Sequence, residues 1–214
     1  KLNYSFVKRL LISVLYGDLF ERLLYRVRPY ESVKGSANTL YDKWLEIARK
    51  NVKSGSYFEF NRNMKRIIRE FDKLETVNFG QKPRVGVVGE ILVKYAPTAN
   101  NDIVGIIERE GGEAVVPDLI GFMNYSLFNQ IWKADELNMS QKTKRLAKLG
   151  IDAINLLEKP MNKALEKSER FEGIESIYNI ADSASKIISI GNHTGEGWFL
   201  TGEMIELLNN DVKN

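Results

Sequence analysis

The first eighty residues carry apolar side chains at helical spacing and contain no convincing strand. From Phe6 onward, apolar residues recur every three or four positions until Arg28-Pro29-Tyr30, where a helix stops because the residue before proline is pushed out of the α region. The same spacing predicts a second helix from about Ser36 to Val52 and a third from Tyr57 to Phe71. Residues 1–78 are therefore predicted to form a helical lead-in region, with 75–83 as a linker.

The pattern changes at Pro83. Arg84–Gly89 is short, valine-rich and closed by glycine, which is typical of a strand buried on both faces. Asn100–Glu110 has helical spacing, and Glu113–Val116 gives a second strand that Pro117 stops. A strand, a helix and a strand in about thirty residues predict a βαβ unit with adjacent parallel strands.

Helical spacing returns after Pro117. Helices are predicted at about 119–136, 140–158, 160–168 and 174–189, and a last helix runs from Trp198 to Leu208. The pattern as a whole predicts an α/β protein, in which a mainly helical N-terminal region precedes a Rossmann-like parallel-sheet domain at 84–214. That domain carries a long helical insertion at 119–189.

Composition limits the classes of protein that fit. At 43% apolar and 28% charged residues, the balance is that of a globular chain, and no apolar run approaches the roughly 20 residues that span a bilayer. The absence of cysteine excludes disulfides, thiolate catalysis and cysteine-ligated zinc or iron–sulfur sites within these residues. Without a secretory signal, a cytoplasmic location is expected, and the ends of the chain suggest an internal fragment of a longer protein.

The charge pattern does not favour a nucleic-acid site. The net charge is +3, and the local basic excess at 138–170 is eight Lys and Arg against four Asp and Glu. A nucleic-acid surface usually needs a denser basic face, so solvated helix faces are the preferred interpretation. No nucleic-acid partner and no membrane are expected.

The segment 90–101 supplies the first candidate site. It is not a dinucleotide fingerprint or a P-loop, because the required glycines and the phosphate-binding lysine are missing. The segment follows the carboxyl end of a predicted strand, and ligands bind at that end of the strands in open α/β sheets. Five of its residues are candidate substrate contacts, with helix capping and packing under the loop as the alternative: Glu90, Lys94, Tyr95, Asn100 and Asn101.

The glycine-rich segment 191–198 supplies the second. It contains the only histidine of the chain, His193, together with Thr194 and Glu196. Histidine can act as acid, base or ligand near neutral pH, but no second histidine or cysteine is present to complete a metal site. The glycines indicate a close backbone approach, either to a ligand or to a packed neighbour. If both segments lie at the same edge of the sheet, one ligand could touch 90–101 and 191–198 together.

Three motifs in order resemble a known family. They are G-E-I-L-V-K-Y-A-P-T-A-N-N, E-G-G-E-A-V-V-P-D-L and G-N-H-T-G-E-G-W-F-L-T-G-E-M, and the upstream R-P-Y-E and Y-x-K-W also match. The chain resembles the bacterial acyl-CoA dehydratase activase-related proteins, which are related to the 2-hydroxyglutaryl-CoA dehydratase and benzoyl-CoA reductase subunits. The resemblance covers nearly the whole sequence.

The resemblance implies a role in an iron–sulfur enzyme. The related dehydratase subunits have Rossmann-like domains and hold a [4Fe–4S] cluster through cysteines beside the acyl-CoA thioester. There, one electron from an ATP-hydrolysing activator starts a ketyl-radical elimination of water. This chain is expected to bind no iron and hydrolyse no ATP, and to form part of an acyl-CoA or electron-transfer site. Its implied partners are an acyl-CoA substrate, the remaining domains of a parent protein and a dehydratase partner. The alternative is a scaffold or interaction domain that binds no substrate.

Overall fold

A computed structural model describes residues 3–212 and is mainly helical, with 67% of the chain in helices and 4% in strands. The prediction of a Rossmann-like α/β domain is wrong. The chain instead forms two compact units, which are described separately. Unit 1 comprises Lys1–Lys82 and Leu157–Ile174, and unit 2 comprises Pro83–Leu156 and Glu175–Asn214.

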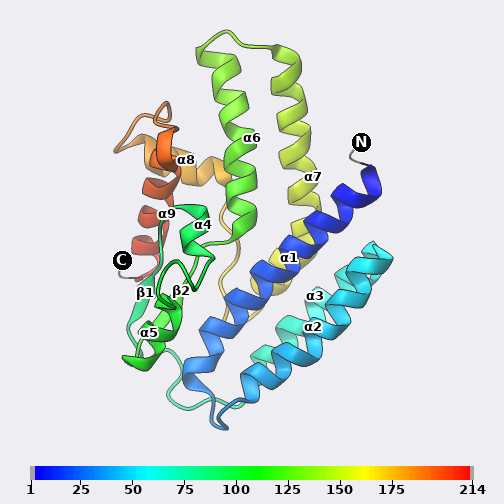
Figure 1. Cartoon of the computed structure of the whole chain (residues 1–214), viewed down its shortest axis with the longest axis vertical. Helices are drawn as coiled ribbons and strands as arrows, with labels where there is room; N and C mark the ends of the chain where they lie inside the picture. Colours follow the sequence, from blue (N-terminus) through cyan, green and yellow to red (C-terminus); the bar gives the residue numbers. More distant parts are fainter. Residues whose placement is uncertain (1–2, 213–214) are drawn as a thin grey trace. The chain divides into compact units, whose positions relative to one another are not determined.

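Unit 1 is built around three long helices that pack on one another (Figure 1). Each buries one apolar face, as the spacing in the sequence predicted, and the core includes Leu15, Leu19, Phe60 and Ile67. The predicted all-helical character of this region is confirmed, with one isolated antiparallel bridge between Glu31 and Thr76. The elements are α1 Tyr4–Val27, the 3-10 helix η1 Arg28–Tyr30, α2 Ser36–Ser54 and α3 Tyr57–Asp72.

The R-P-Y-E motif forms the turn between α1 and α2. Pro29 lies in the first turn of η1, where its missing N–H costs nothing. The Glu31 carboxylate then accepts hydrogen bonds from the backbone N–H groups of Gly35 at 2.6 Å and Ala37 at 2.9 Å. This carboxylate satisfies donors at the start of α2 that have no partner within the helix. The motif therefore has a structural role in this chain.

The Y-x-K-W motif lies on α2 and binds α3. The indole N–H of Trp44, which is fully buried, donates to Glu70 at 3.0 Å, and the same carboxylate oxygen accepts from Lys43 at 2.6 Å. The ring of Tyr41 packs edge-on against Phe20 of α1. These contacts join the three helices, so this motif too is explained by packing.

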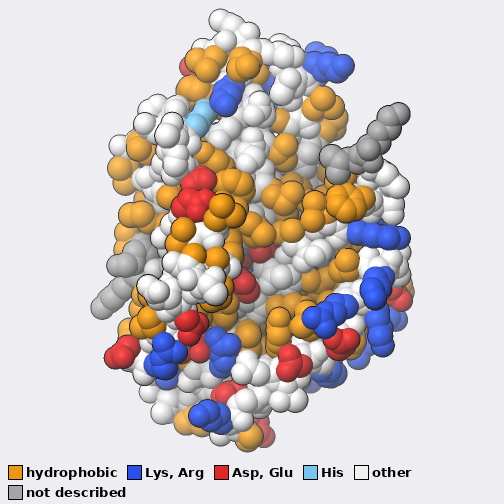
Figure 2. Space-filling model, in the orientation of Figure 1, with side chains coloured by type: hydrophobic (Ala, Val, Ile, Leu, Met, Phe, Trp, Pro, Cys, Tyr) orange, Lys and Arg blue, Asp and Glu red, His pale blue; other side chains and the backbone are white. Residues whose placement is uncertain are grey.

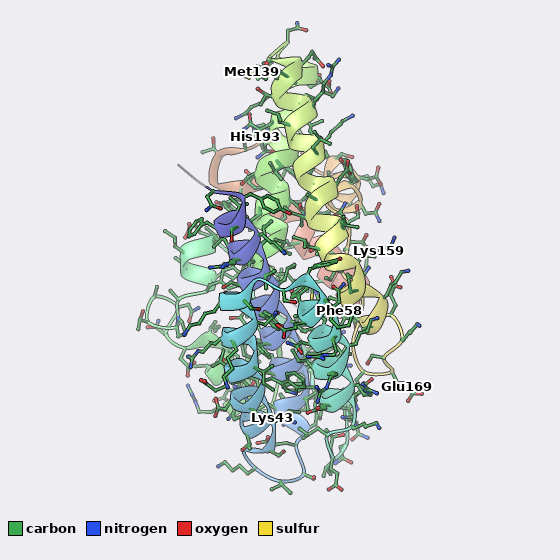
Figure 3. All side chains as sticks on the ribbon, turned by 90° about the vertical axis from the view of Figure 1, so that its right-hand side faces the viewer. Lys43, Phe58, Met139, Lys159, Glu169 and His193 are labelled. Carbon is green, nitrogen blue, oxygen red and sulfur yellow. The ribbon has the colours of Figure 1, made fainter. Side chains whose placement is uncertain are left out.

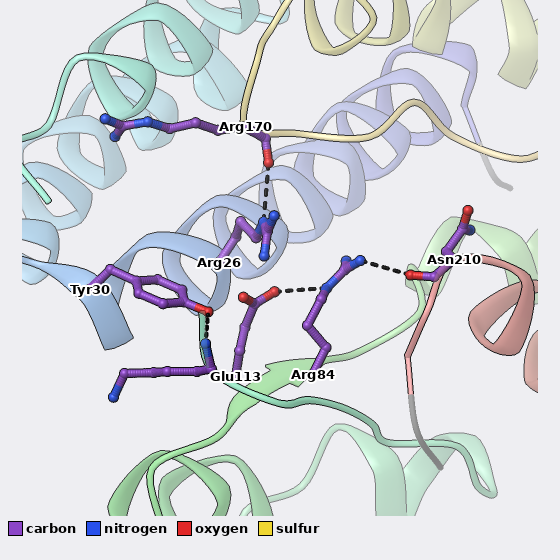
Figure 4. Close-up of polar contacts among 7 residues, drawn as sticks. Arg26, Tyr30, Arg84, Glu113, Arg170 and Asn210 are labelled. Atoms are coloured by element: carbon purple, nitrogen blue, oxygen red, sulfur yellow. Dashed lines mark hydrogen bonds and ion pairs between the residues drawn. The ribbon is translucent and has the colours of Figure 1, made fainter. Parts of the chain in front are cut away.

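Arg170 attaches the 157–174 segment to the rest of unit 1. Its guanidinium donates to the carbonyls of Phe71 at 3.3 Å and Leu74 at 2.8 Å, at the end of α3. It also lies over the ring of Phe79, as does Arg26, whose guanidinium donates to the Arg170 carbonyl at 3.1 Å (Figure 4). A cation at the carboxyl end of a helix satisfies carbonyls that would otherwise lack a partner.

Unit 2 contains a two-stranded parallel sheet. Its strands pair Arg84 with Glu113 and Gly86 with Val115, which confirms the predicted parallel pair. The Arg84 guanidinium bridges the Glu113 carboxylate and the carbonyl of Asn210, both at 3.0 Å (Figure 4). The elements are β1 Arg84–Gly86, α4 Ile91–Lys94, α5 Ile103–Arg109, β2 Glu113–Val115, α6 Leu119–Glu136, α7 Gln141–Leu165, α8 Ile177–Ser185, the 3-10 helix η2 Thr194–Glu196 and α9 Gly197–Asn209. Of these, α7 belongs to unit 2 as far as Leu156 and to unit 1 from Leu157.

Most of the core of unit 2 is helical, which is why the α/β prediction failed. A cluster of buried residues from α6, α7, α8 and α9 surrounds Trp198, Phe199 and Tyr125. The two strands are only three residues long, and no further strand pairs with them among residues 3–212. A parallel sheet normally needs several strands with helices on both faces, so this pair is an addition to a helical core.

The helix boundary predicted at Pro160 is also wrong. Pro160 lies inside α7, which continues from Gln141 to Leu165. Proline removes one backbone donor from a helix but does not have to end it when neighbouring side chains pack well. Here Met161 and Leu165 are buried on the far side of the proline.

Candidate functional site

Polar side chains of the 90–101 segment fold the segment onto itself. The Glu90 carboxylate caps α4 by accepting hydrogen bonds from the amides of Leu92 at 2.9 Å and Val93 at 3.1 Å. The Asn100 amide donates to the last carbonyls of α4 at 2.9 and 3.1 Å, and its oxygen accepts from the first amide of α5 at 3.2 Å. Both side chains are thus occupied by helix ends, which for Asn100 is the capping role considered from the sequence.

Lys94 is buried and forms an ion pair with Glu203. Its Nζ lies 3.1 and 3.2 Å from the two carboxylate oxygens, and the side chains are only 3% and 2% exposed. The neighbouring Tyr95 donates its hydroxyl to the carbonyl of Pro117, and its ring lies 5.1 Å from the Lys94 Nζ. The segment is therefore anchored to α9 by a charge pair and to the start of α6 by a hydroxyl.

The Glu203 carboxyl titrates near neutral pH. Its pKa is raised to about 7, chiefly by burial and to a smaller extent by the carboxylates of Asp118 and Glu196, while Lys94 lowers it. Desolvation therefore outweighs the single cation that faces it. A carboxyl group in this state can accept or release a proton at physiological pH.

The 191–198 segment is a tight turn that Trp198 anchors. Gly195 and Glu196 both adopt left-handed backbone conformations, with φ of 63° and 53°. The Trp198 amide donates to the carbonyl of Asn192 at 3.1 Å, and the buried indole donates to the side chain of Asn129 at 3.0 Å. A Cβ on Gly197 would lie 3.1 Å from the Asn192 carbonyl, so the close approach that the glycines indicated is between parts of the turn itself.

His193 has one ring nitrogen without a partner. Its ring packs edge-on against Trp132 at 4.9 Å, and its carbonyl accepts from the Tyr125 hydroxyl at 2.9 Å (His193 is labelled in Figure 3). Nε2 of the imidazole is buried and has no hydrogen-bond partner. Burial and the positive charge of Lys133 lower the pKa of His193, although the backbone of Ile190 acts in the opposite direction. Near pH 7 the ring is neutral, and Nε2 accepts a hydrogen bond in the tautomer that carries its proton on Nδ1.

Glu196 supplies a second unpaired acceptor in the same turn. Its Oε2 is buried and has no hydrogen-bond partner. Its charge raises the pKa values of both Glu203 and Tyr125. Lys94 of the 90–101 segment and Glu196 of the 191–198 turn thus act on the pKa of Glu203 in opposite directions. That one ligand touches both segments stays a prediction.

The remaining two candidates are at the surface. Asn101 is exposed in a left-handed conformation with φ of 58°, and Thr194 is exposed beside His193. The histidine itself reaches the surface (pale blue in Figure 2). Contact of these residues with a substrate stays a prediction.

Glu203 is the residue that reasoning from the sequence missed. It lies within the third motif, between Phe199 and Leu207, and all three are buried on the same face of α9. The sequence signal for a buried carboxylate was the spacing, because Glu203 lies four residues after Phe199 and four before Leu207. A charge on the apolar face of a helix is almost never buried unless it is paired, so a partner such as Lys94 could have been sought.

The residues present do not fit an iron–sulfur cluster. The sequence has no cysteine, and no group of three His, Asp or Glu side chains in the described part of the chain is arranged to hold a metal ion. Among residues 3–212, no helix has the length and apolar character needed to cross a bilayer.

Comparisons with protein-family models, curated proteins and solved structures gave no match to this chain.

Proposed function

We propose that unit 2 contributes part of an acyl-CoA site to a protein of the 2-hydroxyacyl-CoA dehydratase type, with the 191–198 turn in contact with the ligand. The observation that carries this proposal is the pair of unpaired, buried acceptor atoms in one turn, Nε2 of His193 and Oε2 of Glu196. The resemblance of the three motifs supplies the ligand class.

The chemistry of the ligand matches these acceptors. A buried acceptor without a partner costs about 1–3 kcal/mol, which a bound donor can recover. A 2-hydroxyacyl-CoA carries an α-hydroxyl O–H and two amide N–H groups, all of which donate. His193 and Glu196 would orient such donors.

The proposal limits this chain to binding and orientation. Because the sequence has no cysteine, any [4Fe–4S] cluster would have to be held by residues outside it. No proton or electron transfer is assigned to the residues described here beyond the capacity of Glu203 to exchange a proton near pH 7.

One observation favours a second candidate function, a scaffold or interaction domain that binds no substrate. The side chains of Glu90, Lys94, Tyr95 and Asn100 all have partners within the chain. In that case the motifs shape the fold, and the unpaired acceptors lower the stability of the folded chain without any bound ligand to offset the loss.

Titration calorimetry with 2-hydroxyglutaryl-CoA, glutaryl-CoA and CoA separates the two. We expect the hydroxylated thioester to bind most tightly. His193→Ala and Glu196→Gln should each weaken its binding on the order of tenfold, because each removes one hydrogen bond of about 1.4 kcal/mol. Glu136→Gln, an exposed carboxylate on α6, is the control and should bind normally. Equal affinity for all three ligands, or no binding by a folded wild-type chain, supports the scaffold instead.

A further inference from the structure

A row of leucines on α7 faces solvent. Leu146, Leu149 and Leu156 are 59%, 64% and 62% exposed, and Ala153 between them is also exposed. The four positions are spaced by three, four and three residues, so they form one continuous stripe along the helix, referred to below as the leucine stripe. Large apolar side chains gathered on a surface in this way mark interaction sites.

The leucine stripe is not the face by which α7 joins the core of unit 2. Ala147, Ile151 and Ile154 are buried and point to the opposite side of the helix, where Ala147 and Ile151 join the cluster around Trp198. Figure 3 shows α7 from the side, between the labelled Met139 and Lys159. The helix thus has two apolar faces, of which the structure covers one.

Unpaired cations border the leucine stripe. Lys142, Arg145 and Lys148 are exposed, and none has an acidic partner within residues 3–212, whereas Lys144 pairs with Asp135. On a helical wheel, Lys142 lies in line with the stripe one turn before Leu146, and Arg145 and Lys148 lie on one flank. One carboxylate, Asp152, lies between these two cations on that flank. The surroundings of the stripe therefore carry three cations against one carboxylate.

We propose that the leucine stripe is a docking surface for an acidic amphipathic helix of a partner protein. Leucines at three- and four-residue spacing receive the apolar side chains of a second helix, and glutamates on its flanks pair with the three free cations. A second copy of this chain fits less well, because it would bring the same cations against one another. This surface uses none of the residues proposed to contact the thioester.

Designed peptides test the proposal on the full chain. The probe is a 21-residue helical peptide with leucine at the a and d positions and glutamate at e and g, labelled for fluorescence anisotropy, and the comparison peptide has lysine at e and g. We expect the acidic peptide to bind, its affinity to fall with added salt, and the basic peptide to bind at least tenfold more weakly.

Variants identify the surface. Leu149→Asp should reduce binding of the acidic peptide at least tenfold, while Ile187→Asp, an equally exposed apolar position after α8, should not. The double variant Arg145→Glu with Lys148→Glu should reverse the preference toward the basic peptide. Circular dichroism of each variant establishes that the helices are intact.

Several outcomes overturn the proposal. They are equal binding of both peptides, no binding, and a preference that the charge reversal leaves unchanged. A dimer seen by light scattering that Leu149→Asp dissociates would assign the leucine stripe to a second copy. Binding to vesicles with anionic lipid in place of the acidic peptide would assign it to a membrane surface.

Discussion

The titration of Glu203 should make the stability of unit 2 depend on pH. The pKa of this carboxyl is raised from 4.5 to about 7 in the folded chain. Between these two values the folded state binds a proton that the unfolded state has released. The stabilising effect of that proton is therefore fully present below pH 4.5 and is lost as the pH rises through about 7.

The magnitude follows from the shift. A change of one pKa unit corresponds to about 1.4 kcal/mol, so this group should lower the free energy of unfolding by about 3 kcal/mol across the whole range. From about pH 5 to about pH 8 the loss should be roughly 2–3 kcal/mol. Glu203→Gln removes the titrating carboxyl, so the stability of this variant lacks the contribution of Glu203 to the pH dependence.

The assay is urea unfolding at several pH values, followed by ¹⁹F NMR of the chain labelled with 5-fluorotryptophan. Trp132 and Trp198 report on unit 2 and Trp44 on unit 1. Between about pH 5 and about pH 8, we expect the free energy of unfolding of unit 2 to fall in the wild type relative to Glu203→Gln. The control Glu136→Gln should follow the wild type. Parallel wild-type and Glu203→Gln curves would refute the shifted pKa.

Two further changes test the packing. Arg170→Ala should lower the stability of unit 1 by about 2–3 kcal/mol, because it removes two hydrogen bonds to carbonyls at the end of α3 and the contact with Phe79; an unchanged urea midpoint for Trp44 would contradict this. Gly202→Ala should cost about 1–3 kcal/mol in unit 2, because its Cβ would lie 2.5 Å from the Ile180 side chain and 2.8 Å from its carbonyl. Gly121→Ala, whose nearest contact would be 3.4 Å away, should be tolerated, and the opposite order of stabilities would show the reasoning wrong.

Local structure could be predicted from the sequence where the apolar residues follow a single helical or strand-like spacing. The three helices of unit 1 followed from apolar spacing, and the turn at Arg28–Tyr30 from its proline. The parallel pair of strands followed from two short apolar runs around a helix. In each case the signal lies within a few residues of the element that it specifies.

The architecture of unit 2 could not be predicted in the same way. Whether two parallel strands belong to a large sheet depends on partners elsewhere in the chain, and local periodicity carries no information on them. The helix through Pro160 is a second case, because tertiary packing offsets the local cost of the proline. Glu203 is a third, because only the fold brings Lys94 to its side.

The two motif segments have different physical roles at the candidate site. The 90–101 segment uses Glu90 and Asn100 for its own helix ends and Lys94 for the pair with Glu203. The 191–198 turn keeps acceptor atoms of His193 and Glu196 unpaired.

Glu196 couples these two roles. Because its negative charge raises the pKa of Glu203, a donor that binds Glu196 and neutralises part of that charge lowers the pKa again. Glu203 then ionises more fully and binds Lys94 more strongly. A donor bound to Glu196 and the Lys94–Glu203 ion pair would therefore stabilise one another, although that donor need never touch the lysine.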